Sequence, residues 1–319
     1  MGANAQRMEY NASIIRKGSR SVNDMNIEKH AYMILCHTNP EQVCMLLDLL
    51  DDVRNDIYLH VDKNASDFPQ ATLPEHVKKA GLFFIDPIRI SWGGDSITRA
   101  ELLLLKEAVK TPHSYYHLIS GADLPLKTQD EIHKFFASCG GKDFVGYVKD
   151  LTPQEERAVL DRVDYYYPFQ NRLQRYDGSF LWKLQLALVK LQKIARLRRT
   201  VKYGIQFAKG INWFSITHDT ALFILGEYPK YEHVFQNTFC SDELFVQTIL
   251  QQSERISNVV KSSLRMEDWK RGNPYTFREE DFDLLMNGSG DKIFARKFDE
   301  KVDKAVIEKI YNTLKSAQN

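Results

Sequence analysis

The sequence lacks several features that would place a protein in a particular class. No window approaches the roughly 18 apolar residues of a membrane-spanning helix, and residues 1–29 hold no apolar core that would serve as a secretory signal. The four cysteines form no CxxC pair and no metal-ligand spacing. The 43 basic and 42 acidic residues leave a net charge of +1, which predicts no general attraction to nucleic acid. These absences indicate a globular protein of the cytoplasm.

Glycine-patterned nucleotide motifs are also missing. No GxGxxG follows a predicted strand and no GxxxxGKS/T occurs. The sequence therefore gives little support for a dinucleotide-binding site or a P-loop. His37 and His60 could suggest a metal ligand pair, but no third ligand stands at a telling spacing, and a lone histidine after a strand more often packs or hydrogen-bonds. We therefore expect no metal site.

Three short apolar runs in the first half each end in a polar cluster. They read AYMILC before HTNP, DIYLHV before DKN, and YYHLIS before GADLP, and each predicts a β-strand. Helical patterns after the first and third runs indicate βα units and a mostly parallel sheet, in which ligands bind beyond the carboxyl ends of the strands. Six polar residues are therefore expected along one rim: His37, Asn39, His60, Asp62, Ser120 and Asp123.

The remaining pattern fits a single α/β domain at 30–319 behind a disordered leader at 1–29. Within it, 30–150 is expected to bind nucleotide and 151–319 to complete the site. Strands are predicted at 31–36, 57–61, 82–85, 115–119, 144–147 and 211–216. Helices are predicted from an Asn39 cap with Pro40 at the first position, over 96–109, from a Thr128 capping box, over 218–225, and from a Ser241 cap.

Several charged residues could carry chemistry, each with a plainer alternative. Asp62 ends a strand, where a carboxylate can bind a ribose or base, or simply cap a turn. Glu243 opens a helix whose N-terminus favours the ionised carboxylate, so it could act as a general base or only stabilise the helix dipole; Asp242 is the rival base. A cationic group could hold a diphosphate without a metal or form a solvated surface cluster: Arg278, Arg296 and Lys297.

A basic amphipathic helix is predicted over 182–202. Leucine, isoleucine and valine interleave there with seven cations and no acid. The pattern suits the surface of an anionic membrane, although a helix whose basic face is simply solvated fits it too. The cations are Lys183, Lys190, Lys193, Arg196, Arg198, Arg199 and Lys202.

Taken in order, a set of segments resembles the core-2/I-branching N-acetylglucosaminyltransferase family (glycosyltransferase family 14), which includes the protein xylosyltransferases. The segments are IYLHVDKN, ISWGG with ITRAELLLL, HLISGADLPLKT, INWFSITHDTALFI, SDELFVQTIL, LRMEDWKRGNPYTFREEDFDLL and IFARKFD. They cover about residues 30–300. The resemblance implies a GT-A-type fold, with a Rossmann-like nucleotide half joined to an acceptor half, and inverting transfer of a sugar from a UDP donor.

The resemblance also implies roles for individual residues. Glu243 matches the catalytic base, Arg278 and Lys297 match the pair that holds the donor diphosphate, and Asp62 matches an aspartate near the uridine. Trp269 matches an aromatic residue that contacts the acceptor sugar. His37 and Asp123 are expected to complete the donor side from the rim.

The resemblance also implies a metal-independent reaction. Many members work without a divalent metal, and SGAD supplies only Asp123 where a DxD motif would stand. N-acetylglucosamine is the first candidate donor sugar, and the absent lumenal disulfide frame suggests a bacterial-type enzyme of surface polysaccharide or glycolipid assembly. A UDP-xylose-using enzyme and a catalytically silent sugar-nucleotide-binding protein are the alternatives.

Overall fold

The central strand β1 (His30–Cys36) explains the unbroken apolar run AYMILC. A computed structural model describes residues 29–173 and 178–318, so the predicted leader lies outside it except for Lys29. Within β1, Tyr32, Ile34 and Cys36 pack into one core, whereas Ala31, Met33 and Leu35 pack into a second core on the other face. A strand buried on both faces needs apolar side chains at successive positions, as parallel strands inside α/β proteins do.

Seven strands form the main sheet in the order β3-β2-β1-β4-β7-β6-β8. The other six are β2 (Asn55–Val61), β3 (Gly81–Phe84), β4 (Tyr115–Ser120), β6 (Asp143–Val145), β7 (Phe214–Thr217) and β8 (Val259–Val260). The pairs among β1 to β4 are parallel, and β7 runs antiparallel to both neighbours. The predicted α/β class with a mostly parallel sheet is confirmed.

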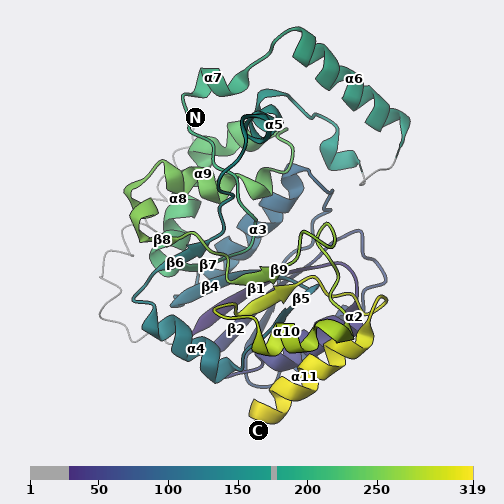
Figure 1. Ribbon diagram of the computed structural model, residues 1–319, viewed down its shortest axis with the longest axis vertical. Coiled ribbons are helices and arrows are strands. Elements are labelled where there is room, and N and C mark those ends of the chain that lie inside the picture. The colour runs from purple at the N-terminus through teal and green to yellow at the C-terminus, as the bar shows by residue number, and fades with distance from the viewer. Residues whose placement is uncertain (1–28, 174–177, 319) are drawn as a thin grey trace, which may run out of the picture.

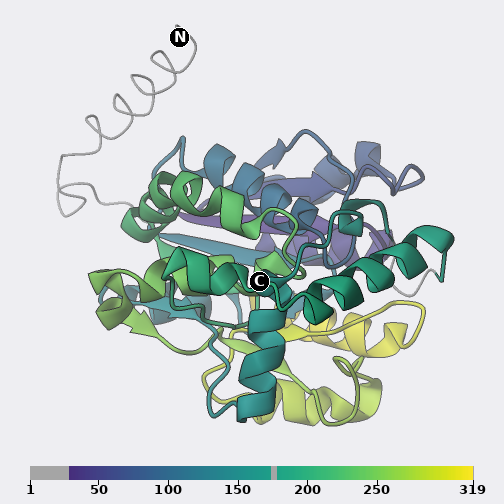
Figure 2. The same ribbon diagram turned by 90° about the horizontal axis from the view of Figure 1, so that it is seen from above.

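Helices cover both faces of this sheet, as Figures 1 and 2 show from two directions. One face packs on α2 (Pro40–Leu50), α4 (Gln129–Ser138), α10 (Phe282–Asn287) and α11 (Lys304–Gln318). The other packs on α3 (Asp95–Ala108), α5 (Pro153–Asp164), α8 (His218–Phe235) and α9 (Phe245–Gln251). Each layer buries its own apolar core.

A small second sheet continues from the carboxyl end of β4. Its order is β5-β10-β9, formed by β5 (Asp123–Pro125), β10 (Phe294–Arg296) and β9 (Arg265–Glu267). Only two residues separate β4 from β5, so β9 and β10, which come from the C-terminal part of the chain, lie at the rim where ligands were expected.

Short elements complete the chain. The 3₁₀ segments are η2 (Gln70–His76), η3 (Gln170–Arg172), η4 (Ser241–Glu243), η5 (Glu254–Asn258) and η6 (Glu279–Asp281). The predicted basic helix is divided into α6 (Phe180–Ile194) and α7 (Arg199–Tyr203), because Arg196 adopts a left-handed backbone with φ 53°.

Helix starts follow the sequence signals unevenly. Thr128 and Glu131 form the predicted capping box, and Pro40 occupies the first position of α2. Asn39, however, has φ 58° and makes no capping hydrogen bond through its side chain. The helix predicted from Ser241 is wrong in detail: this hydroxyl bonds Thr98 Oγ1 at 2.9 Å instead of capping, and a turn of 3₁₀ helix separates it from α9.

Candidate active site

Glu243 ends a strained turn on the side of the sheet covered by α3. Cys240 has φ 50°, and its N–H donates to the carbonyl of Gly93 at 2.8 Å, which fixes the turn against the SWGG loop. The Glu243 carbonyl accepts from Gly210 N–H at 2.9 Å. Its side chain is 30% exposed. Backbone contacts on both sides therefore hold a carboxylate that solvent and ligands can reach.

Two cations face this carboxylate. Arg162 on α5 donates to Glu243 Oε2 at 2.6 Å, and Lys209 Nζ lies 3.5 Å from the same oxygen. Their positive charges offset the negative charge of the carboxylate. Within residues 29–173 and 178–318 no hydrogen bond reaches Oε1, so one oxygen remains to accept a proton from a ligand.

The neighbouring Asp242 is in the opposite situation. It is 8% exposed, and its Oδ1 has no hydrogen-bond partner among the described residues. Burial, and next the charge of Glu243, raise the pKa of Asp242 to about 7. Glu101 on α3 is also buried, and burial followed by the charge of Asp242 raises its pKa well above the usual range. The geometry therefore favours Glu243 over Asp242 as the accessible base.

A second charged group crosses the small sheet. Arg296 on β10 is the register partner of Asp123 on β5 and of Glu267 on β9. Its guanidinium donates to Asp123 Oδ1 at 2.8 Å and also to Ser120 Oγ. Asp123 is fully buried, and its second oxygen accepts from Ser120 N–H at 2.7 Å. Its burial favours positioning of Arg296 over the direct donor contact that the sequence predicted.

Aromatic side chains border this group. The Arg296 guanidinium lies 4.5 Å from the ring centroid of Trp213, which is only 6% exposed. Trp269 is 55% exposed, and its Nε1–H donates to Glu267 at 3.1 Å. Burial raises the pKa of Glu267, against the hydrogen bond from Trp269 and the charge of Arg296. The predicted acceptor residue Trp269 thus contacts Glu267, which is the register partner of Arg296 in the small sheet.

Three predicted donor-site residues, His37, Asp62 and Lys297, are close enough to interact electrostatically near the ends of β1 and β2. Desolvation lowers the pKa of His37, the charge of Asp62 opposes this effect, and the charges of Lys297 and Arg296 add to it. Asp62 accepts from the N–H groups of Asn64 and Ile90 at 2.9 and 3.1 Å through one oxygen, so the turn role considered from the sequence is present. The ends of β1 and β2 therefore lie near the C-terminal cations Arg296 and Lys297.

A backbone hydrogen bond brings the segment that contains Arg278 next to Lys297. The N–H of Phe277 donates to the Lys297 carbonyl at 2.9 Å, and Arg278 is the next residue, exposed at the start of η6. No ion pair involves either Arg278 or Lys297 within the part of the chain that the structure describes. Both cations are therefore available to an anionic ligand.

The segment from Lys209 to Trp213 joins the two charged groups. Lys209 faces Glu243, and Trp213 stacks against Arg296. Four peptide steps separate these residues, which limits the distance between their Cα atoms to roughly 14 Å. One short segment thus contacts both the carboxylate of Glu243 and the guanidinium of Arg296.

Two other rim residues do not reach the site. His60 is buried within β2, where its Nε2 accepts from Ile88 N–H at 3.1 Å, so the packing role is the one observed. Asn39 is 5% exposed at the start of α2. Among the described residues, no group of three or more His, Cys, Asp or Glu side chains could hold a metal ion.

Sequence reasoning missed the partners that set this geometry. Arg162 and Lys209 lie outside the segments that carry the resemblance, and Trp213 and Glu267 lie inside them without a predicted role. Arg162, Lys209 and Trp213 contact their partners only across the fold. Trp213 and Lys209 stand in the segment just before β7, where a basic residue and a tryptophan near a strand offered only a weak signal.

Comparison with known proteins identifies the family of this chain. The family model of the Core-2/I-branching enzymes matches residues 30–285. The chain belongs to this family of glycosyltransferases. Described residues include no helix with both the length and the apolar character needed to cross a bilayer.

The named relatives are xylosyltransferases. Xylosyltransferase 2 of Rattus norvegicus is 24% identical over 305 residues, covering 87% of this chain and 33% of the relative. Xylosyltransferase oxt of Drosophila pseudoobscura pseudoobscura is 24% identical over 296 residues, covering 83% of this chain and 31% of the relative. The chain thus spans about a third of the length of these relatives. A crystal structure of mouse xyloside xylosyltransferase 1 without ligand has a TM-score of 0.37 and 10% identity, covering 84% of this chain and 96% of that one.

Proposed function

We propose that this chain is an inverting glycosyltransferase that moves a sugar from a UDP-sugar to a hydroxyl group of a glycan acceptor. One observation carries the proposal: the accessible carboxylate of Glu243 faces Lys209, and the segment from Lys209 to Trp213 leads to Arg296. The next residue, Lys297, has no ion-pair partner in the described chain. A displacement at a sugar carbon needs both features, a proton acceptor for the nucleophile and positive charge for the leaving diphosphate. Family membership supports the same reaction class.

In this mechanism Glu243 acts on the acceptor. Its Oε1 accepts the proton of the acceptor hydroxyl while that oxygen bonds to the anomeric carbon. The bond from this carbon to the β-phosphate oxygen breaks, and UDP leaves with the electron pair. Attack from the face opposite UDP inverts the configuration. Lys297 and Arg278 stabilise the charge that develops on the diphosphate, and Arg162 keeps Glu243 oriented.

The remaining predicted residues have supporting places in this scheme. We assign Asp62 and His37 to the nucleoside side of the donor, because they lie at the carboxyl ends of β1 and β2. Asp123 holds Arg296 toward the site, and exposed Trp269 offers its ring to the acceptor sugar. Lys297 and Arg278 supply the positive charge, so we propose donor binding without a divalent metal.

N-acetylglucosamine is the first donor sugar that we propose, and xylose is the second. The second candidate is supported by the relatives, which are named xylosyltransferases. The proposed acceptor is a saccharide of a bacterial surface polysaccharide or glycolipid. A panel of UDP-N-acetylglucosamine, UDP-xylose, UDP-galactose and UDP-glucose, read by UDP release, would identify the donor. If the protein binds the nucleotide but releases no UDP from any of these donors, with or without an acceptor, it is a silent binding protein.

The base assignment is tested with Glu243→Gln. This change removes the proton acceptor but keeps the shape, so turnover should fall by roughly 10²–10⁴ while UDP affinity in calorimetry stays within about twofold. Glu254→Gln, at an exposed glutamate on η5, is the matched control and should keep full activity. Turnover like that of the wild type in Glu243→Gln would rule out the assignment.

The role of Lys297 is tested separately. Lys297→Ala should weaken UDP binding and reduce turnover together, by roughly 10²–10³ in turnover if the lysine stabilises the leaving group. Lys301→Ala, at an exposed lysine four residues on, should change neither. Unchanged UDP affinity in Lys297→Ala would show that the diphosphate binds elsewhere.

A further inference from the structure

An exposed apolar stripe runs along the whole of α6. Five positions spaced four, three, four and three residues apart lie on one side of a helix. Four of them are large apolar side chains that solvent reaches: Phe180 at 81%, Leu184 at 36%, Leu191 at 60% and Ile194 at 69%. The remaining position, in the middle of the five, is Ala187, which is also exposed. We call these five residues the α6 stripe.

The opposite side of α6 is anchored to the body of the protein. Gln185 is 4% exposed, accepts from Phe169 N–H at 2.9 Å and donates to Gln170 at 2.6 Å. Gln192 accepts from Tyr166 N–H and donates to the Tyr166 carbonyl at 2.7 and 3.0 Å. These polar contacts fix the rotation of the helix. The stripe therefore points outward because of its anchor, and α6 lies at the edge of the molecule (Figures 1 and 2).

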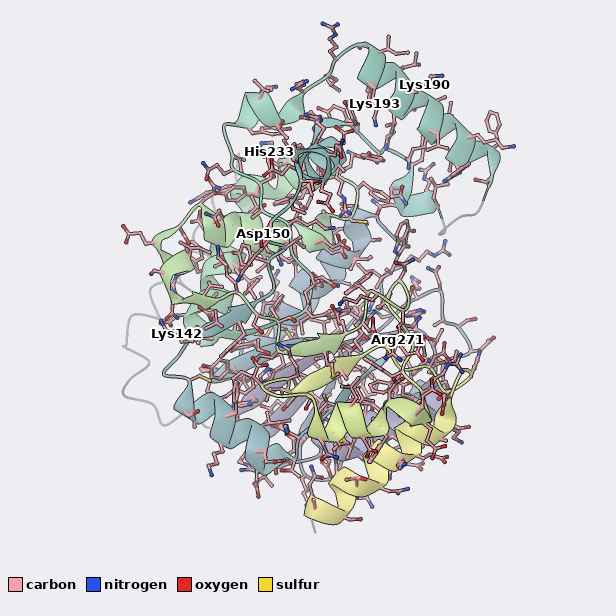
Figure 3. All side chains as sticks on the ribbon, viewed as in Figure 1. Lys142, Asp150, Lys190, Lys193, His233 and Arg271 are labelled. Carbon is pink, nitrogen blue, oxygen red and sulfur yellow. The ribbon has the colours of Figure 1, made fainter. Side chains whose placement is uncertain are left out.

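The charges around the stripe all have one sign. Residues 178–218 contain no Asp or Glu. Two of the seven predicted cations turn inward: Lys193 lies 3.1 Å from Asp161, and Arg199 is 4% exposed and donates to the carbonyl of Val234. Figure 3 labels Lys193 and Lys190 on α6. The other five cations are exposed and form no ion pair within the described chain: Lys183, Lys190, Arg196, Arg198 and Lys202.

These observations favour one kind of partner. A second copy of α6 laid on the stripe would bring Lys183 and Lys190 of both copies together with no acid on either helix, and like charges at such positions destabilise a helix pair. A bilayer with anionic lipid satisfies both features, since apolar side chains enter the headgroup boundary and cations meet the phosphates. Because α6 has 15 residues and extends only about 22 Å, it would lie in the plane of the bilayer.

We propose that the outer face of α6 and α7 binds the surface of a bilayer that contains anionic lipid. Val201 on α7, 75% exposed, extends the apolar contact beyond the stripe. The anchor of α6 on Tyr166 directly follows α5, whose Arg162 holds Glu243. The proposed membrane-binding helix α6 is thus connected through Tyr166 and α5 to the candidate active site. The inference does not depend on the proposed reaction, because it is tested by lipid binding alone.

The test is sedimentation of the full chain with vesicles of phosphatidylcholine, or of phosphatidylcholine mixed with phosphatidylglycerol. We expect salt-sensitive binding to the anionic vesicles only. The double variant Leu191→Glu, Ile194→Glu should lose about tenfold or more in affinity. Lys183→Gln with Lys190→Gln should lose roughly 30-fold, from the typical contribution of each lysine near an anionic surface. Val53→Glu, at a 64% exposed valine away from α6, is the control and should bind normally.

Three results would overturn the inference. The first is no sedimentation of the wild-type chain with anionic vesicles. The second is equal binding by the wild type and both double variants. The third is a concentration-dependent dimer in analytical ultracentrifugation that Leu191→Glu dissociates, because this would identify a second copy as the partner. All substituted side chains are exposed, so unchanged circular dichroism spectra should accompany each result.

Discussion

The buried carboxyl group of Asp242 should make the stability of the protein depend on pH. Its side chain is 8% exposed, and one oxygen has no hydrogen-bond partner among the described residues. The charge of Glu243 acts on it more strongly than the opposing charge of Arg162. Burial in such surroundings favours the protonated form, which raises the pKa of Asp242 to about 7. In the unfolded chain the same group has a pKa of about 3.9.

The sign of the effect follows from proton binding. Between about pH 4 and pH 7 the folded protein keeps a proton on Asp242 that the unfolded chain has released, so this contribution to stability falls as pH rises. The slope is about 1.36 kcal/mol per pH unit. From pH 5 to pH 8 two of those units lie in the window, which gives a loss of about 2.7 kcal/mol.

Asp242→Asn removes the titrating group and keeps its shape. We expect the free energy of unfolding of the variant, relative to the wild type, to rise by about 2–3 kcal/mol between pH 5 and pH 8. Urea denaturation followed by circular dichroism at both pH values measures the difference. Asp86→Asn, at an exposed aspartate after β3, should leave the pH dependence as it is. A constant difference between Asp242→Asn and the wild type would refute the reasoning.

Three further substitutions test the backbone. A Cβ at Gly210 would lie 1.9 Å from the Gly146 carbonyl oxygen, so Gly210→Ala should lower the unfolding free energy by about 1–3 kcal/mol or more and reduce turnover through the adjacent Glu243. Thr128→Ala breaks a complete capping box and should cost about 1 kcal/mol in urea denaturation. Asn39→Gly should stay within about 0.5 kcal/mol of the wild type, because Asn39 has a left-handed backbone and caps nothing; a loss as large as that of Thr128→Ala would contradict this.

The parts of the fold predicted from sequence are those with local causes. The apolar run of β1 and the proline at the start of α2 act within a few residues, and both elements occur where they were expected. The helix α5 (Pro153–Asp164) was missed although it has a capping box at Thr152 and Glu155, because its surroundings read as a polar, irregular segment. The sequence pattern also did not show that β7 would enter the sheet antiparallel.

The candidate site was harder to predict because its contacts are long-range. Glu243 and its partner Arg162 are 81 positions apart, and Arg296 and Asp123 are 173 positions apart. No pattern within a window can report such pairs, and the resemblance supplied only the motif residues themselves. The burial of Asp123 was equally out of reach, since a polar residue at a strand end can point outward or be enclosed by a later strand such as β10.

The distribution of charge argues for an anionic ligand more strongly than any single residue does. Glu243 is matched by Arg162 and Lys209, and Arg296 is matched by Asp123 with Glu267 as its other register partner. Lys297 lies close enough to lower the pKa of His37, yet it forms no ion pair in the described parts of the chain. An uncompensated cation beside compensated ones is at lower free energy when a ligand supplies the negative charge. A diphosphate would supply it here, which is why the loss of Lys297 should affect nucleotide affinity, whereas the loss of Glu243 should affect turnover alone.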